Sequence, residues 1–246
     1  MKKIVFKNKE EMGKAAAASA AEKISRAIEN KGEANIILAT GTSQFETLKP
    51  LVSYEEIDWS KVRMFHLDEY IGLGEEHPAS FRKYLKERFV EQVRTLKAVH
   101  FIDGDAEDLQ AECRRLGEII TACPIDIALV GIGENGHLAF NDPPADFETQ
   151  EPFIIVKLNE TCRKQQLGEG WFETIDDVPK WAVSMSVRQI MKSDCIIASV
   201  LQRRKAQAVK SAIEGNVSNM CPASILQEHP NCEVYLDEEA ASELST

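Results

Sequence analysis

The chain has 246 residues, of which 43% are hydrophobic and 28% are charged, with a formal net charge of -11. These proportions are typical of folded globular proteins and exclude a disordered or fibrous chain. The negative charge also argues against general binding to nucleic acid, because phosphates repel an acidic surface that has no extended basic patch.

Short β-branched segments alternate along the chain with longer amphipathic segments. In chain order, strands are expected at residues 4–6, 35–38, 62–67, 125–130, 181–185, 195–200 and 233–236. Helical spacing of apolar residues predicts helices at residues 10–29, 44–48, 81–93, 106–120 and 204–213. This alternation predicts βα units, and hence an α/β fold: a three-layer α/β/α sandwich with a mostly parallel, Rossmann-like sheet.

No linker, repeat or low-complexity tract divides residues 1–246, so we expect a single domain. Residues 138–177 are the least regular stretch and are predicted to form an extended loop or lid. The six cysteines are scattered without a C-x-x-C pair, which indicates reduced thiols in a cytoplasmic protein and no structural zinc. No apolar run is long enough to span a bilayer, so neither secretion nor membrane anchoring is expected.

Ligands of open parallel sheets bind beyond the carboxyl ends of the strands, so the loops that follow strands are the candidate sites. Thr40, Gly41, Thr42 and Ser43 follow one strand and precede a helix, as an anion-binding loop would, although an ordinary helix cap uses the same residues. Lys205, at the start of a later helix, offers a cation for the same anion; a solvated surface charge is the alternative.

Two further loops carry acid and base groups. Asp68 and Glu69 end one strand, and adjacent carboxyl groups near a ligand can have pKa values suited to moving a carbon-bound proton; solvated loop charges are the alternative. His137 stands in a glycine-rich turn with Asn135 and Asp142 nearby, where a carboxylate can orient the imidazole. A structural histidine is the ordinary alternative.

The glycine-rich turn spells G-x-G-x-x-G at residues 131–136. It lies outside the first βαβ unit and runs into Pro143 and Pro144 instead of a long helix, which excludes dinucleotide binding. Taken together, the four loops indicate proton-transfer chemistry on a small phosphorylated substrate.

Three motifs resemble the glucosamine-6-phosphate deaminase/isomerase family, which is related to the 6-phosphogluconolactonases. They are M-F-H-L-D-E-Y-I-G-L with H-P-A-S-F in residues 64–81, G-I-G-E-N-G-H-L-A-F-N-D-P in residues 131–143, and V-P-K-W-A-V in residues 178–183. The resemblance covers nearly the whole chain. It implies conversion of glucosamine 6-phosphate to fructose 6-phosphate and ammonia without a cofactor or metal, and a small amino sugar phosphate as partner, with homo-oligomer formation left open.

The resemblance also implies individual roles. Asp68 corresponds to the base that moves a proton between C2 and C1 through an enolamine, and His137 to the acid/base that opens the sugar ring. Asp142 stands where the family usually has a glutamate that supports this histidine. Because aspartate has a shorter side chain, the alternative is that its contact with His137 is lost or bridged by water. Asn135 stands where some members have an aspartate.

The loop of Thr40 to Ser43 resembles the family's phosphate loop, with Gln44 in place of its usual proline, and Lys205 matches a phosphate-binding lysine. Glu69 and Gly136 are also expected to contact the substrate. A family arginine that binds phosphate has no match, because Gly168 lies near its place. We hypothesise that one of three arginines substitutes for it: Arg163, Arg188 or Arg203.

Three other functions stay open at this point. A galactosamine-6-phosphate deaminase/isomerase is the nearest alternative, because the departures at Gln44, Asn135 and Asp142 leave the epimer undecided. A lactonase-like hydrolase is less favoured, because Tyr70 stands where lactonases typically have arginine and Asn141 departs from their G-H-x-A-S-L-F pattern. The third is a sugar-phosphate sensor that binds its ligand without turnover.

Overall fold

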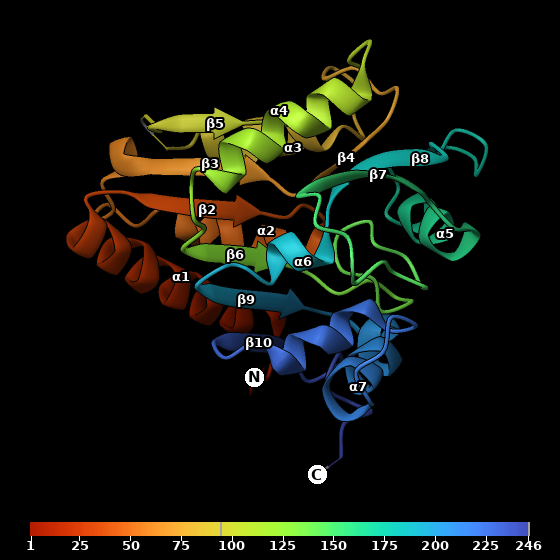
Figure 1. Cartoon of the computed structure of the whole chain (residues 1–246). Helices are drawn as coiled ribbons and strands as arrows, with labels where there is room; N and C mark the ends of the chain where they lie inside the picture. Colours follow the sequence, from red (N-terminus) through yellow and green to blue (C-terminus); the bar gives the residue numbers. More distant parts are fainter. Residues whose placement is uncertain (94, 246) are drawn as a thin grey trace.

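The computed structural model describes residues 1–93 and 95–245, and its centre is a seven-stranded sheet (Figure 1). The strands are all parallel where they pair. Their order across the sheet is β1 (Lys2–Phe6), β10 (Cys232–Asp237), β9 (Cys195–Val200), β6 (Ile127–Val130), β2 (Ala34–Leu38), β3 (Val62–His66) and β5 (Ala98–His100). The predicted parallel α/β sheet is confirmed.

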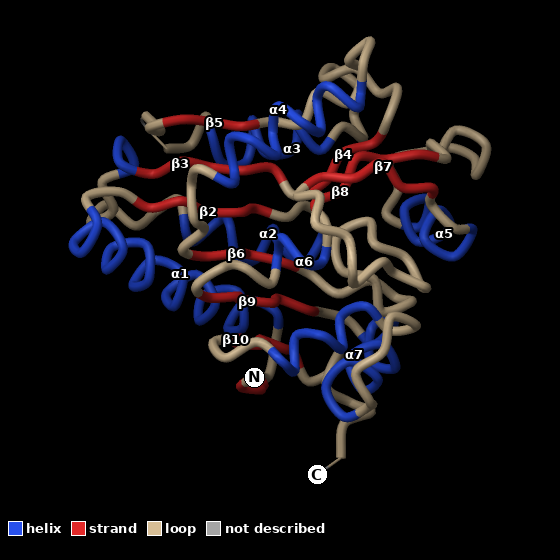
Figure 2. Tube along the Cα trace, in the orientation of Figure 1, coloured by secondary structure: helices blue, strands red, loops and turns tan. Residues whose placement is uncertain are grey.

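Helices cover both faces of this sheet (Figures 1 and 2). One face packs against α1 (Lys9–Lys31), α2 (Thr42–Leu51), α3 (Phe81–Leu85) and the π-helical turn Lys86–Val90. The other packs against α4 (Leu109–Thr121), α6 (Val187–Ile190), α7 (Ala206–Glu214) and the 3-10 segment Pro222–Glu228. Two short 3-10 turns lie at Trp59–Lys61 and Arg203–Lys205.

The central strands are mostly apolar because both of their faces are buried. In β2, Ile36 and Leu38 belong to the core under α1 and α2, whereas Ile37 belongs to the core on the opposite face. In β6, Leu129 belongs to the core under α1 and α2, and Ala128 belongs to the core on the opposite face. Side chains alternate between the faces of a strand, so a strand that is covered on both sides reads as an uninterrupted hydrophobic run.

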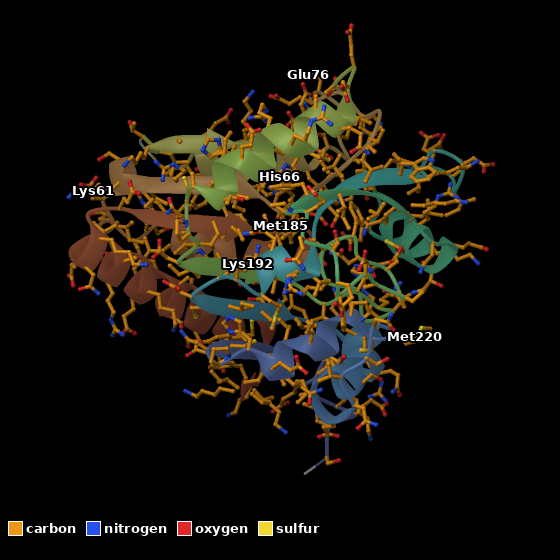
Figure 3. The ribbon with its side chains drawn as sticks, viewed as in Figure 1. Lys61, His66, Glu76, Met185, Lys192 and Met220 are labelled. Atoms are coloured by element: carbon orange, nitrogen blue, oxygen red, sulfur yellow. The ribbon has the colours of Figure 1, made fainter. Side chains whose placement is uncertain are left out.

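A second sheet is antiparallel and has three strands, in the order β4 (Asp68–Tyr70), β8 (Trp181–Met185) and β7 (Phe153–Lys157). Only Leu67 separates β3 from β4. Its carbonyl accepts a hydrogen bond of 2.9 Å from the backbone N–H of Met185. Figure 3 shows His66 and Met185 close to this junction. The strand expected at residues 181–185 therefore forms, but outside the parallel sheet.

The predicted lid at residues 138–177 is more regular than an extended loop, because it contains β7 and the helix α5 (Glu160–Gly168). The Asn159 side chain caps α5 by accepting a hydrogen bond from the Cys162 backbone. Tyr70, Phe140 and Phe172 form a small separate core beneath this region. No helix among the described residues has the length and apolar character needed to cross a membrane.

Candidate active site

All four candidate loops open onto one pocket. They follow β9, β6, β2 and β3, which are neighbours in that order in the central sheet. Because these strands are parallel, their carboxyl ends meet at the same edge of the sheet. The predicted residues that line the pocket are Thr40, Gly41, Thr42, Ser43, Asp68, His137 and Lys205.

The loop after β2 presents backbone N–H groups to the pocket at the first turn of α2. Gly41 precedes that turn with φ +99°, a left-handed conformation that favours glycine, and no side chain caps the helix. The Gln44 side chain is fully buried and donates from Nε2 to the Val130 carbonyl at 3.1 Å, which ties the loop to the end of β6. The uncapped N–H groups are suited to an anionic group.

Lys205 supplies the positive charge on the opposite side of this loop. Its side chain is buried, and burial lowers the pKa of its ammonium to about 8, although Glu169 and Glu134 act in the opposite direction. Arg204 pairs with Glu134 at 3.0 Å, whereas Lys205 forms no ion pair within the described part of the chain. A buried and unpaired ammonium is costly, so an anion in the pocket would be held strongly.

Asp68 also lines the pocket, and it is the first residue of β4. Burial raises the pKa of its carboxyl group to about 8, and the adjacent Glu69 carboxylate adds to the rise. A carboxyl group with this pKa changes protonation near neutral pH and is suited to general acid/base catalysis. The pocket therefore combines a tuned acid with an anion-binding loop.

His137 reaches the pocket from the loop after β6 and is supported from behind by Asp142. Its Nδ1 lies 3.3 Å from the Asp142 carboxylate, so the shorter aspartate keeps the contact, although the two groups are not aligned for a hydrogen bond. Burial raises the pKa of Asp142, but interactions with His137, Asn135 and the Asn159 backbone outweigh it, so the pKa lies below its usual value. Asn135 donates to Asp142 at 2.8 Å and accepts from the His137 backbone N–H at 3.1 Å.

The turn that carries His137 depends on close packing. A side chain at position 133 would come within 2.2 Å of the imidazole ring, so only glycine leaves room for this histidine. Asn135, Gly136 and Asp142 do not line the pocket, and they act on it through His137. Gly136 instead packs against Cys221 in a left-handed conformation with φ +80°.

Glu69 differs most from its expected role, because its fully buried carboxylate points into the protein. It accepts hydrogen bonds from the backbone of Tyr70, Phe81 and Arg82 and from the Ser80 hydroxyl. It does not line the pocket. Glu69 holds the start of α3 against β4 rather than meeting a ligand.

None of the three arginines proposed to complete the phosphate site lines the pocket. The Arg163 guanidinium donates to the carbonyls of Val178 and Ile175. Arg203 is three-quarters exposed and faces Glu243, and Arg188 is exposed on α6. Lys205 is the cation that lines the pocket among the described residues.

Sequence reasoning missed three polar residues on α5 and at its end, where a lid without regular structure was expected. Gln165 accepts from the Glu134 backbone at 2.8 Å, Gln166 accepts from the Tyr70 hydroxyl at 2.7 Å, and Glu169 follows one turn later. All three line the pocket. Their spacing on one helical face was the available signal.

A family model described as glucosamine-6-phosphate isomerases/6-phosphogluconolactonase matches residues 7–235. The chain belongs to this family. It is 38% identical over 244 residues to glucosamine-6-phosphate deaminase of Lactobacillus delbrueckii subsp. bulgaricus, covering 98% of this chain and 99% of that one. It is 37% identical over 247 residues to the deaminase of Thermoanaerobacter pseudethanolicus, covering 98% and 94%.

Among solved structures, a monomeric glucosamine-6-phosphate deaminase matches with a TM-score of 0.90 and 34% identity, covering 99% of this chain and 100% of that one. The 6-phosphogluconolactonase from Trypanosoma brucei matches with a TM-score of 0.80 and 18% identity, covering 99% and 98%. The second likeness concerns the fold alone. Membership of the family confirms the resemblance inferred from the three motifs.

Proposed function

We propose that this family member converts glucosamine 6-phosphate to fructose 6-phosphate and ammonia. The observation that carries the proposal is that Asp68 and His137 line the same pocket as the anion-binding loop and Lys205. The deaminase relatives at 37–38% identity, which the chain matches over nearly its whole length, support the same activity.

In this proposal the phosphate binds to the Thr40–Ser43 loop and Lys205, which fixes the sugar within the pocket. His137 takes the proton of the C1 hydroxyl and delivers it to the ring oxygen, which opens the ring and leaves an aldehyde at C1. Asp68 then takes the proton from C2 while the aldehyde oxygen gains a proton from solvent, which forms an enolamine. Asp68 returns its proton to C1, and the nitrogen loses a proton to solvent, which leaves an imine at C2. Water hydrolyses the imine to the ketone, and ammonia leaves.

The same proposal includes one domain over residues 1–246 and a cytoplasmic location. Only Leu67 separates β3 from β4, so the first passage of the chain from one sheet to the other has no linker. All six cysteines are free thiols, as expected in a reducing compartment. The proposed steps are a hydrolysis and proton transfers that involve Asp68, His137 and solvent, so the proposed reaction requires neither a metal nor a redox cofactor.

An ammonia-release assay with the 6-phosphates of glucosamine, galactosamine and mannosamine tests the function. We expect the highest kcat/KM with glucosamine 6-phosphate, and a higher value with the galactose epimer would overturn the substrate assignment. Hydrolysis of 6-phosphogluconolactone, measured in parallel, would instead indicate a lactonase. Binding without ammonia release or solvent deuterium exchange at C2 would indicate a sensor.

The pH dependence of kcat/KM follows from two groups in the free enzyme. Asp68 acts as a base only when ionised, so activity rises as pH increases toward its pKa of about 8. Lys205 binds phosphate as a cation, so activity falls as pH increases beyond its pKa of about 8. We therefore expect a narrow maximum near pH 8.

Lys205→Arg is the informative control for this profile, because arginine stays charged at high pH. It should remove the alkaline decline and leave the acidic limb unchanged. A flat profile between about pH 6 and pH 9 would contradict both assignments.

A further inference from the structure

Three side chains with metal-binding atoms meet behind the catalytic pocket. Nδ1 of His137, a carboxylate oxygen of Asp142 and Sγ of Cys162 all lie within 4.8 Å of one another. The first two come from the loop after β6, whereas Cys162 comes from the first turn of α5. Cys162 is fully buried, and the mechanism above gives it no role.

The spacing suits a tetrahedral zinc ion. Zinc bound to nitrogen and oxygen at about 2.0 Å separates the two atoms by about 3.3 Å. Nδ1 of His137 lies 3.3 Å from the carboxylate of Asp142. Sγ needs a longer bond of about 2.3 Å, so a shift of roughly an ångström in α5 completes three of the four ligands. A water molecule would take the fourth position.

The surroundings are also those of a metal site. Nδ1 of His137 is buried and has no well-aligned hydrogen-bond partner among the described residues. The carboxylate of Asp142 is held by the Asn135 side chain and by the Asn159 backbone N–H, each at 2.8 Å. Such outer hydrogen bonds orient metal ligands and strengthen binding.

We propose that His137, Asp142 and Cys162 form an inhibitory site for zinc. Binding replaces the thiol proton of Cys162, which leaves to solvent, and the sulfur and imidazole each donate an electron pair to the ion. The metal then lies between His137 and Asp142, and the bound imidazole no longer transfers protons to the substrate. The inhibition, though not the binding, rests on the proposed function.

Cobalt reports on this site without reference to activity. A cysteine thiolate bound to Co²⁺ gives a near-ultraviolet charge-transfer absorption, which we expect in the wild-type protein and not in Cys162→Ser. Cys162→Ala serves the same purpose if the serine variant does not fold. Cys221→Ser is the matched control, since Cys221 packs against the same turn at Gly136 and lies outside the three-residue site.

In the activity assay, zinc should inhibit ammonia release by the wild type, and a chelator should restore the rate. Loss of the thiolate should raise the zinc concentration for half-inhibition at least about tenfold, because even outer-shell changes weaken binding by about 10–100-fold. The uninhibited rate should be unchanged. Absence of the cobalt band in the wild type, or its persistence in both Cys162 variants, would overturn the proposed zinc site. Absence of ammonia release alone would overturn only the proposed function.

Discussion

Replacing Asp68 by asparagine is expected to lower kcat for ammonia release by about 10²–10⁴-fold, the usual contribution of a general base. Asparagine has nearly the same shape but takes no proton, so KM should change little. The pocket would keep its anion loop and Lys205, to which the phosphate binds in the proposed function. Steady-state kinetics, together with solvent deuterium exchange at C2, measures both the overall reaction and the proton-transfer step.

Glu169→Gln is the matched control, because Glu169 is a second carboxylate that lines the same pocket. Glu169 lies beside the anion loop and Lys205 rather than next to Asp68. Its neutralisation should therefore affect KM and leave kcat within about tenfold of the wild-type value, a smaller change than the loss of a general base causes. An Asp68→Asn enzyme that keeps a tenth or more of the wild-type kcat would contradict the role of Asp68 as the base.

Replacing Lys205 by methionine is expected to raise KM by about 10–100-fold, with a smaller effect on kcat. A hydrogen bond to a charged group contributes about 1.5–3 kcal/mol, and each 1.4 kcal/mol corresponds to a tenfold change in affinity. Methionine keeps most of the buried volume of lysine and removes its charge. Competitive inhibition by inorganic phosphate should weaken in parallel, which separates phosphate binding from recognition of the sugar.

Arg204→Met provides the comparison within the same turn. Arg204 pairs with Glu134 and does not line the pocket, so its loss should change KM by less than about threefold, as for an exposed ion pair. If Lys205→Met leaves both KM and phosphate inhibition at wild-type values, the anion site lies elsewhere in the chain.

The sequence by itself determined the fold class and most of the polar and charged residues that line the pocket. Mostly apolar runs such as residues 195–200 indicate strands buried on both faces, and glycine and hydroxyl residues after residue 38 indicate an anion loop. Both signals are local, because they depend on periodicity and on the residues that end a strand. Asp68, His137 and Lys205 were predicted in this way.

Only the tertiary structure decided which strands are neighbours and where each side chain of the site points. The order β9, β6, β2 and β3 brings residues more than 130 positions apart into one pocket, and β7 and α5 form where an extended loop was expected. Glu69 turns inward while Asp68 faces the pocket, because adjacent residues of a strand point to opposite sides. Which side is buried depends on distant partners, here the backbone N–H groups at the start of α3. Contacts between segments far apart along the chain leave no periodic pattern, so they had to be observed.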